Sequence, residues 1–227
     1  MAQITDLYIY PVKSLKGIAL KEAQTAQRGL EFDREWMITD QDYNFISQRE
    51  IELMTTIETD IDSDSLILTS NNQKTLKIPL DSSRSNQVRA VVWDDLCDAF
   101  DEGDEASRWL TEVLGTFRGS LLRLVRFDQK GERPVPKKYL HGVHAESAFS
   151  DQFPYLITSW ESLSRLNTGL SENDSFEVSM NRFRPNIVVK GLPNVEMMTS
   201  SNLVCAKSGY QFGLRKPCKR CKITTID

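Results

Sequence analysis

Short strand-like segments fill residues 3–97, and they constrain the possible fold more than any other feature of the chain. The segments are rich in β-branched and aromatic residues, or alternate apolar with polar ones, as strands do. Turn-forming residues such as Gly17, Gly29 and the asparagines at 71–72 separate them. Such even spacing favours a β-barrel or a β-sandwich. The expected strands are 4–9, 18–26, 34–39, 45–48, 54–59, 65–69, 76–80 and 88–93.

After residue 101 the apolar spacing becomes that of an amphipathic helix. Acidic residues before this helix and a glycine after it agree with the preferences of helix ends. Its apolar face consists of Ala106, Trp109, Leu110, Val113 and Leu114. The fold class is therefore expected to be mainly β with a few helices (α+β). The remaining predicted elements are a strand at 121–127, a loop at 128–149, a strand at 155–158, a helix capped by Ser159, a strand at 185–189, a hairpin of 203–207 with 210–214, and a strand at 223–226.

Composition places the chain among ordinary globular proteins. Its 227 residues are 40% hydrophobic and 26% charged, with a formal net charge of -4. A dedicated nucleic-acid binder would be strongly basic, so specific nucleic-acid binding is not expected. No apolar run has the length of a signal peptide or a membrane span, and there are only four cysteines. We therefore expect a cytoplasmic protein with reduced thiols and no membrane contact.

Two cysteines near the C-terminus, Cys218 and Cys221, lie among five cations within residues 215–225. The thiolate is the form of cysteine that binds metals, and neighbouring cations lower the pKa of a thiol. The same cations suit an anionic ligand. From spacing alone, half of a zinc site, a redox dithiol and an inert thiol pair stay open as alternatives. Zinc would need four ligands, and the other cysteines, Cys97 and Cys205, stand alone.

Other polar groups offer weaker indications. His141 and His144 have a spacing compatible with metal binding, but they lie in a polar loop where solvated histidines are the simpler interpretation. Basic residues in the same loop, Arg133, Lys137 and Lys138, would guide an anionic substrate.

Five motifs in a fixed order resemble one family. They are Tyr10-Pro11-Val12-Lys13-Ser14, Asp33-Arg34-Glu35-Trp36, Pro154-Tyr155-Leu156-Ile157, Phe183-Arg184-Pro185-Asn186 and Lys216-Pro217-Cys218-Lys219-Arg220-Cys221. Together they are similar to the MOSC family in its two-part form, which has an N-terminal β-barrel domain and includes the YcbX-like oxidoreductases and the mitochondrial amidoxime-reducing component. The resemblance implies a MOSC N-terminal domain over 1–118 and a MOSC domain over 119–227, with the family's last strands expected to be missing after Asp227.

The resemblance also implies a molybdenum cofactor, a pterin dithiolene that carries a phosphate. Cys221 would be the metal ligand and the catalytic residue. A phosphorylated pterin requires cations, hydroxyls and amides, which agrees with the residues at the matching motif positions. The implied cofactor-binding residues are Lys13, Ser14, Arg34, Ser159, Arg184, Asn186, Arg220 and Cys221.

The function implied by the resemblance is a molybdenum-dependent oxidoreductase that reduces small N-hydroxylated compounds, such as N-hydroxylated bases or amidoximes. A separate flavin or iron-sulfur reductase would supply electrons, because the chain has neither a G-x-G-x-x-G motif nor four gathered cysteines. Pyridoxal phosphate is not expected, since no aminotransferase-like region is present. Two alternatives are a non-catalytic carrier of the cofactor or of sulfur, with a persulfide on Cys221, and a protein that serves only as an interaction surface.

Overall fold

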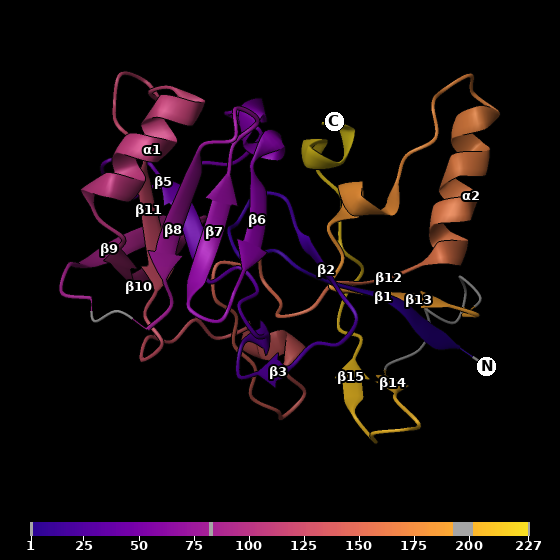
Figure 1. The fold of residues 1–227 in the computed structure, drawn as a ribbon. Coiled ribbons are helices and arrows are strands. Elements are labelled where there is room, and N and C mark those ends of the chain that lie inside the picture. Colours follow the sequence, from indigo (N-terminus) through magenta and orange to yellow (C-terminus); the bar gives the residue numbers. More distant parts are fainter. Residues whose placement is uncertain (1, 82–83, 193–201, 227) are drawn as a thin grey trace.

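The computed structural model describes residues 2–81, 84–192 and 202–226, and most of its regular structure is β (Figure 1). Three sheets of three or four strands and two short hairpins account for all named strands in these ranges. The strands are β1 Gln3–Ile9, β2 Ile18–Leu20, β3 Thr25–Ala26, β4 Gly29–Leu30, β5 Trp36–Thr39, β6 Glu58–Ile61, β7 Ser65–Thr69, β8 Thr75–Pro79, β9 Gln87–Val92, β10 Asp95–Asp101, β11 Arg123–Phe127, β12 Ile157–Ser159, β13 Ile187–Lys190, β14 Asn202–Val204 and β15 Gln211–Gly213.

Two α-helices and four short 3₁₀ turns complete the fold of the described residues. Helix α1 spans Asp104–Leu114 and packs against β11 and β8, whereas α2 spans Trp160–Ser171 and packs against β12 and β13. The 3₁₀ turns are η1 Glu52–Thr56, η2 Lys137–Tyr139, η3 Met180–Phe183 and η4 Lys222–Thr225. The chain is thus mainly β with two α-helices, as the sequence predicts.

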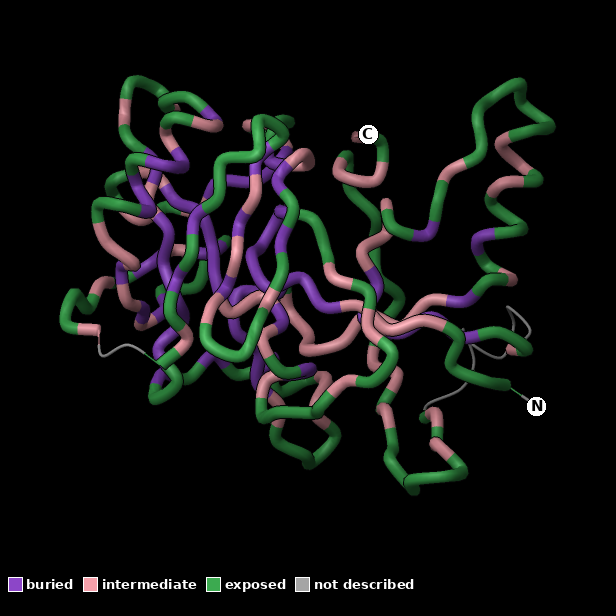
Figure 2. The backbone as a smooth tube through the Cα atoms, viewed as in Figure 1, coloured by how far each residue is buried: buried purple, intermediate pink, exposed green. Residues whose placement is uncertain are grey.

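The larger lobe contains a sheet of order β5-β11-β10-β9 and a meander of order β6-β7-β8. One apolar core, which includes Trp36, Leu66 and Leu110, joins the meander, the first sheet and α1. A second core on the strands of the four-stranded sheet includes Met37 and Phe127. Buried residues are concentrated in this lobe (Figure 2). None of the sheets closes on itself in the described ranges, so the expected closed barrel is not seen there.

The smaller lobe is built on a sheet of order β12-β13-β1-β2, with α2 against it. The N-terminal strand β1 pairs with β13 in antiparallel fashion, with Gln3 opposite Lys190. Its core of buried residues is small, and consists of Leu163, Met180 and Val188. The chain segments that follow β1 and β4 and the segment that precedes β12 lie between the two lobes, and they carry Lys13, Arg34 and Asp151 of the site described below (Figure 1).

Four predicted strands are wrong in whole or in part. The predicted strand 18–26 is interrupted, since β2 ends at Leu20 and β3, in another sheet, begins at Thr25. Residues 45–48 make only isolated bridges, at Asn44 and Phe45, and 52–56 form the turn η1, so the strand starts at Glu58. Residues 222–225 form η4 instead of a strand. No strand in the described part of the chain lies beside them, so their backbone closes local bonds from Thr224 N to Cys221 O and from Ile226 N to Ile223 O.

Candidate functional site

A buried lysine lies at the centre of the site. Lys13 lies in the segment after β1. Its backbone N–H donates to Trp36 O at 2.8 Å, which holds this segment against β5. Its ammonium contacts Asp151 Oδ1 at 2.5 Å. The lysine side chain is only 8% exposed, whereas that of Asp151 is 75% exposed, so the pair runs from the interior to the surface. Burial lowers the pKa of Lys13 to about 8, although Asp151 partly opposes this effect.

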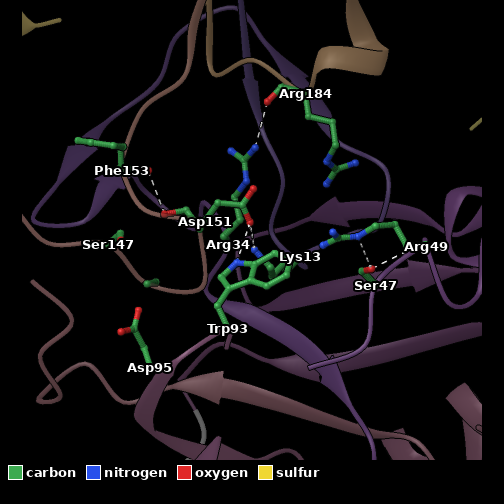
Figure 3. A network of polar contacts seen from close by, with 12 residues as sticks. Lys13, Arg34, Ser47, Arg49, Trp93, Asp95, Ser147, Asp151, Phe153 and Arg184 are labelled. Atoms are coloured by element: carbon green, nitrogen blue, oxygen red, sulfur yellow. Dashed lines mark hydrogen bonds and ion pairs between the residues drawn. The ribbon is translucent and has the colours of Figure 1, made fainter. Parts of the chain in front are cut away.

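The carboxylate of this pair is ionised at neutral pH. Partial loss of hydration beside the surrounding protein acts to raise the pKa of Asp151, but the attraction of Lys13 and a weaker one of Arg34 outweigh this effect, and the pKa falls to about 2. Asp151 Oδ1 also accepts a hydrogen bond from the indole Nε1 of Trp93 at 3.3 Å. An ionised carboxylate accepts hydrogen bonds and donates none. Asp151 is therefore a fixed acceptor at the surface end of the pair (Figure 3).

Two arginines stack on one tyrosine beside this pair. The guanidinium carbons of Arg34 and Arg184 lie 4.3 and 4.2 Å from the ring centre of Tyr10. Arg34 donates from Nη1 to both carboxylate oxygens of Asp33 at 2.7 Å, and from Nη2 to Arg184 O at 3.0 Å. Both arginines have positive φ, near 53°. This left-handed backbone is uncommon for non-glycine residues and is found where neighbouring structure enforces it, often at functional sites.

Arg184 has a buried donor without an acceptor. Its Nη2 atom is inaccessible and makes no hydrogen bond among the described residues. Burial, together with the nearby charge of Arg34, lowers the pKa of Arg184 to about 10. Buried polar groups are nearly always paired, because an unpaired donor loses its hydration without compensation. The arrangement of Lys13, Arg34 and Arg184 therefore fits an anion that would accept a bond from Arg184 and offset the excess positive charge.

A different arginine fixes the loop that carries Asp151. Arg133 is buried and donates to the carbonyl oxygens of Ala148, Ser150 and Asp151 at 2.8, 2.5 and 3.1 Å. It also contacts the carboxylate of Asp95 at 2.8 Å. The expectation that Arg133 guides a substrate on the surface is therefore wrong, because its donors bind backbone carbonyls inside the protein. Lys137 and Lys138 from the same loop are exposed.

The cationic segment with the two thiols lies against the same region. Lys216 Nζ donates to the side chain of Gln152 at 2.6 Å, one residue after Asp151. Arg220 Nη2 donates to Phe183 O at 2.5 Å, one residue before Arg184. Both Cys218 and Cys221 are exposed, and Arg220 Nη1 lies 3.2 Å from Cys218 Sγ. Lys13, Arg34 and Arg184 are called the cation cluster below. The segment thus contacts the chain on both sides of this cluster, and Cys221 directly follows Arg220, its last contact.

The other candidate residues have structural contacts of their own. Ser159 is fully buried and caps α2, accepting from Ser162 N at 3.2 Å, as the sequence predicts for this helix start. The amide of Asn186 accepts from Leu156 N and donates to Tyr8 O, so it joins backbone segments. In the described ranges, no contact joins Ser159 or Asn186 to the cation cluster. Ser14 is buried next to Lys13, with a positive φ of 70°.

The histidine loop does not form a metal centre of its own. His144 Nε2 lies 2.7 Å from a carboxylate oxygen of Glu146, a partner that the sequence pattern did not indicate. Across residues 2–81, 84–192 and 202–226, no group of three or more His, Cys, Asp or Glu side chains is arranged to hold a metal ion. In the same ranges, no helix is long and apolar enough to span a membrane.

Two models of known protein families match the chain. The model of the MOSC N-terminal beta barrel domain matches residues 1–117, and that of the MOSC domain matches residues 144–227. The chain belongs to the MOSC family. The similarity agrees with the five motifs of the sequence, and it places the cation cluster in both matched regions, since Lys13 and Arg34 lie in the first and Arg184 lies in the second.

Curated relatives of this MOSC protein cover nearly its whole length. It is 30% identical to mitochondrial amidoxime-reducing component 1 of Homo sapiens and 31% identical to mitochondrial amidoxime reducing component 2 of Rattus norvegicus, in each case over 99% of this chain and 66% of the relative. It is 25% identical to molybdenum cofactor sulfurase of Homo sapiens, over 99% of this chain and 26% of the relative. The chain thus spans less than two thirds of the length of these relatives.

Several groups of the site were not identified from sequence. Tyr10 and Asp33 lie inside the motifs, directly before Pro11 and Arg34, and this position is the only signal for them in the sequence. Asp151 and Trp93 had no motif signal. Trp93 was predicted as the last residue of a strand, whereas it lies in the turn after β9. The contact between them joins two loops, which single-sequence patterns do not reveal.

Anion binding by the MOSC protein should depend on pH. We expect its affinity for sulfate, which does not titrate in this range, to fall as the pH rises through about 8, because Lys13 then loses its charge in the ligand-free protein. Calorimetric titration from pH 6.5 to pH 9.5 measures this. A Lys13→Arg variant is the matched control, since arginine keeps its charge. An equal decline in the variant would show that another group is responsible.

The lowered pKa of Lys13 also makes the stability of the folded protein depend on pH. The pKa of Lys13 is 10.5 when unperturbed and about 8 in the folded protein, so the unfolded chain binds more protons between these values. The burial of the charged lysine therefore costs stability below pH 8, and this cost is progressively relieved as the pH rises toward 10.5. Without a ligand, the Lys13→Arg variant should not show this gain in stability above pH 8.

Proposed function

We propose that this MOSC protein is a molybdenum-cofactor-dependent oxidoreductase that reduces N-hydroxylated compounds. The observation that carries the proposal is the unpartnered Nη2 of Arg184 within a cluster that also contains Lys13 and Arg34. A cofactor with an anionic phosphate and a metal that prefers sulfur fits such a cluster beside an exposed thiol. The names of the amidoxime-reducing relatives support the reaction class.

The roles proposed for the side chains follow from their contacts. Lys13, Arg34 and Arg184 bind the anionic part of the cofactor, and Arg220 fixes the cysteine segment through Phe183 O. Cys221 supplies the thiolate that ligates the metal. Ser14, Ser159 and Asn186 stay proposed contacts of the cofactor, although Ser159 and Asn186 also bind backbone groups around the site. Asp33 orients Arg34, and Asp151 fixes the ammonium of Lys13. When bound, the cofactor supplies two-electron redox chemistry.

The proposed reaction breaks the N–O bond of a small N-hydroxylated base or amidoxime. The nitrogen keeps its substituents and gains hydrogen, the oxygen leaves as water, and the balance requires two electrons and two protons. We propose that a separate flavin or iron-sulfur reductase supplies the electrons. The names of the mitochondrial relatives, in which each protein is called a component, support a system of several proteins.

We also propose a division into two domains, 1–118 and 119–227. The two family matches, which leave residues 118–143 between them, support this division. The strand pairings cross it in both directions, since β11 lies in the sheet of β5 and β10, whereas β1 lies in the sheet of β13. The domains would then exchange strands at their junction, where the cation cluster lies.

Metal analysis with an activity assay tests the proposed function. The protein is produced in cells that supply molybdenum cofactor, and molybdenum per chain is measured together with the reduction of benzamidoxime by chemically reduced viologen. We expect close to one molybdenum per chain and reduction that depends on it. The similarity to molybdenum cofactor sulfurase and the two exposed thiols favour one alternative, a carrier of the cofactor or of sulfur. Persulfide on Cys221 without molybdenum, or bound molybdenum without N–O reduction, would favour that alternative.

A further inference from the structure

Trp93 is an exposed aromatic residue at the edge of the cation cluster. It is 44% exposed, whereas Trp36 and Trp109 are buried. Val92 of β9 pairs with Asp95 of β10, so Trp93 is the first residue of a two-residue hairpin loop. The loop therefore places an indole at the surface end of the Lys13–Asp151 pair (Figure 3).

The backbone of Trp93 is unusual for a large residue. Its φ is 56°, in the left-handed region, and only the first of the two loop residues has a positive φ. A hairpin loop of this kind favours glycine at the first position, because a side chain there is crowded by the backbone. A bulky residue in such a conformation persists where surrounding contacts hold it, and such residues are concentrated at ligand sites. The turn alone therefore does not explain the tryptophan.

Four side chains fix the indole. Its Nε1 donates to Asp151 Oδ1 at 3.3 Å, and its ring meets that of Phe45 edge to face, with centres 5.4 Å apart. The charged groups of Arg49 and Lys13 lie 4.7 and 5.7 Å from its ring centre. Arg49 is held in turn by Ser47 Oγ at 3.2 Å. A ring held in this way loses little conformational freedom when a ligand binds, which favours affinity.

We propose that the uncovered part of the Trp93 indole is a platform on which a planar nitrogen heterocycle stacks. Asp151 would accept a hydrogen bond from an N–H or N–OH group of that ring. Its Oδ1 atom already binds Lys13 and Trp93, but no bond to Oδ2 is found within the described ranges, and the side chain is 75% exposed. The indole favours flat rings that can stack on it, and the ionised carboxylate of Asp151 favours rings that carry an N–H or O–H donor at their edge.

This inference rests on the proposed function and adds a selectivity to it. Two compounds that take part in the proposed function contain a flat nitrogen heterocycle with a donor at its edge. They are an N-hydroxylated purine or pyrimidine as substrate, and the pterin of the cofactor. Stacking of one base on an aromatic side chain corresponds to about a 5- to 150-fold gain in affinity. Ring compounds should therefore bind more tightly than an N-hydroxylated compound of similar polarity that has no ring.

The indole N–H signals in a two-dimensional NMR spectrum test the proposal without any activity. The full chain is titrated separately with 6-N-hydroxylaminopurine, with 6-hydroxymethylpterin and with acetamidoxime, which has an N–OH group but no ring. The signals of Trp93 and Trp160 are assigned from the Trp93→Phe and Trp160→Phe variants. Trp160 is the matched control, because it is 39% exposed and its Nε1 also binds a hydroxyl and a carboxylate, those of Thr5 and Asp6.

We expect saturable shifts of the Trp93 signal with at least one heterocycle, no comparable shift of Trp160, and weak effects of acetamidoxime. Trp93→Gly, which suits the positive φ, should raise the Kd of that heterocycle about 5- to 150-fold, whereas Trp160→Phe leaves it unchanged. Tighter binding of the purine assigns the platform to the substrate, and tighter binding of the pterin assigns it to the cofactor.

Three results would overturn the proposal: equal shifts of both tryptophans, no shift with either heterocycle, or an unchanged Kd in Trp93→Gly. Trp93→Phe should give an intermediate Kd, since it keeps an aromatic face without the indole N–H. The proposed function can fail independently. A protein without molybdenum or N–O reduction would still show the NMR shifts, and an active molybdenum protein without them would refute the platform alone.

Discussion

Replacing Arg184 with methionine should weaken anion binding while leaving the ligand-free protein as stable as before, or more stable. The change removes a buried Nη2 donor that has no partner and a charge that is repelled by Arg34. Apolar replacement of buried charged groups is often neutral or stabilising. Loss of one charge-assisted contact should lower the affinity for sulfate or for the cofactor about 10- to 150-fold. Calorimetric titration and thermal unfolding measure the two effects.

Arg133 provides the matched control, because it is also buried but all its donor groups are used. Arg133→Met would leave the carbonyl oxygens of Ala148, Ser150 and Asp151 without their donor. Breaking a buried charged network of this kind costs at least about 3 kcal/mol, or a decrease in Tm of roughly 6–12 °C for a chain of this size. A large loss of stability in Arg184→Met, or sulfate affinity equal to that of the unchanged protein, would refute the role assigned to Arg184.

Cys221→Ser should remove nearly all molybdenum from the purified protein and with it the reduction of N-hydroxylated compounds. The hydroxyl of serine is not ionised at neutral pH and is a poor substitute for a thiolate ligand. Both cysteines are exposed, so neither substitution opens a cavity in a core. Molybdenum per chain, measured on protein from cells that supply cofactor, is the primary readout.

Cys218→Ser is the control for this experiment. Its sulfur lies 3.2 Å from Arg220 Nη1, and a serine oxygen can accept a hydrogen bond from the same donor. The segment should therefore keep its anchor on Phe183, and we expect most of the molybdenum to be retained. Equal molybdenum content in the unchanged protein and in Cys221→Ser would show that Cys221 is not the metal ligand.

Local patterns predicted the elements that depend on local contacts. The apolar face at 106–114 identified α1, the cap at Ser159 identified the start of α2, and the turn at 208–209 identified the β14–β15 hairpin. The errors arose where a strand needs a neighbour. Residues 223–226 are β-branched, but the bonds formed there are local, so propensity alone gave the wrong element.

The site was predictable only in part, for the same reason. Motif resemblance indicated Lys13, Arg34 and Arg184, and the structure brings these three side chains to one region. Asp151 and Trp93 reach Lys13 from other loops, and no local spacing encodes these contacts. Arg133 was interpreted as a surface cation because its loop is polar, although its guanidinium is buried among backbone carbonyls.

The pairing of β1 with β13 has a consequence for how the chain folds. β1 can pair with β2 soon after synthesis, but because Gln3 pairs with Lys190, its other edge stays unpaired until the residues of β13 have been synthesised. Contacts between residues so distant in sequence slow folding, since a long loop must close before the contact is gained. Lys13 follows directly after this strand, so its final position is also set late. The larger lobe has its own cores and can condense earlier, which leaves the β13-facing edge of β1 unpaired and open to association with other chains.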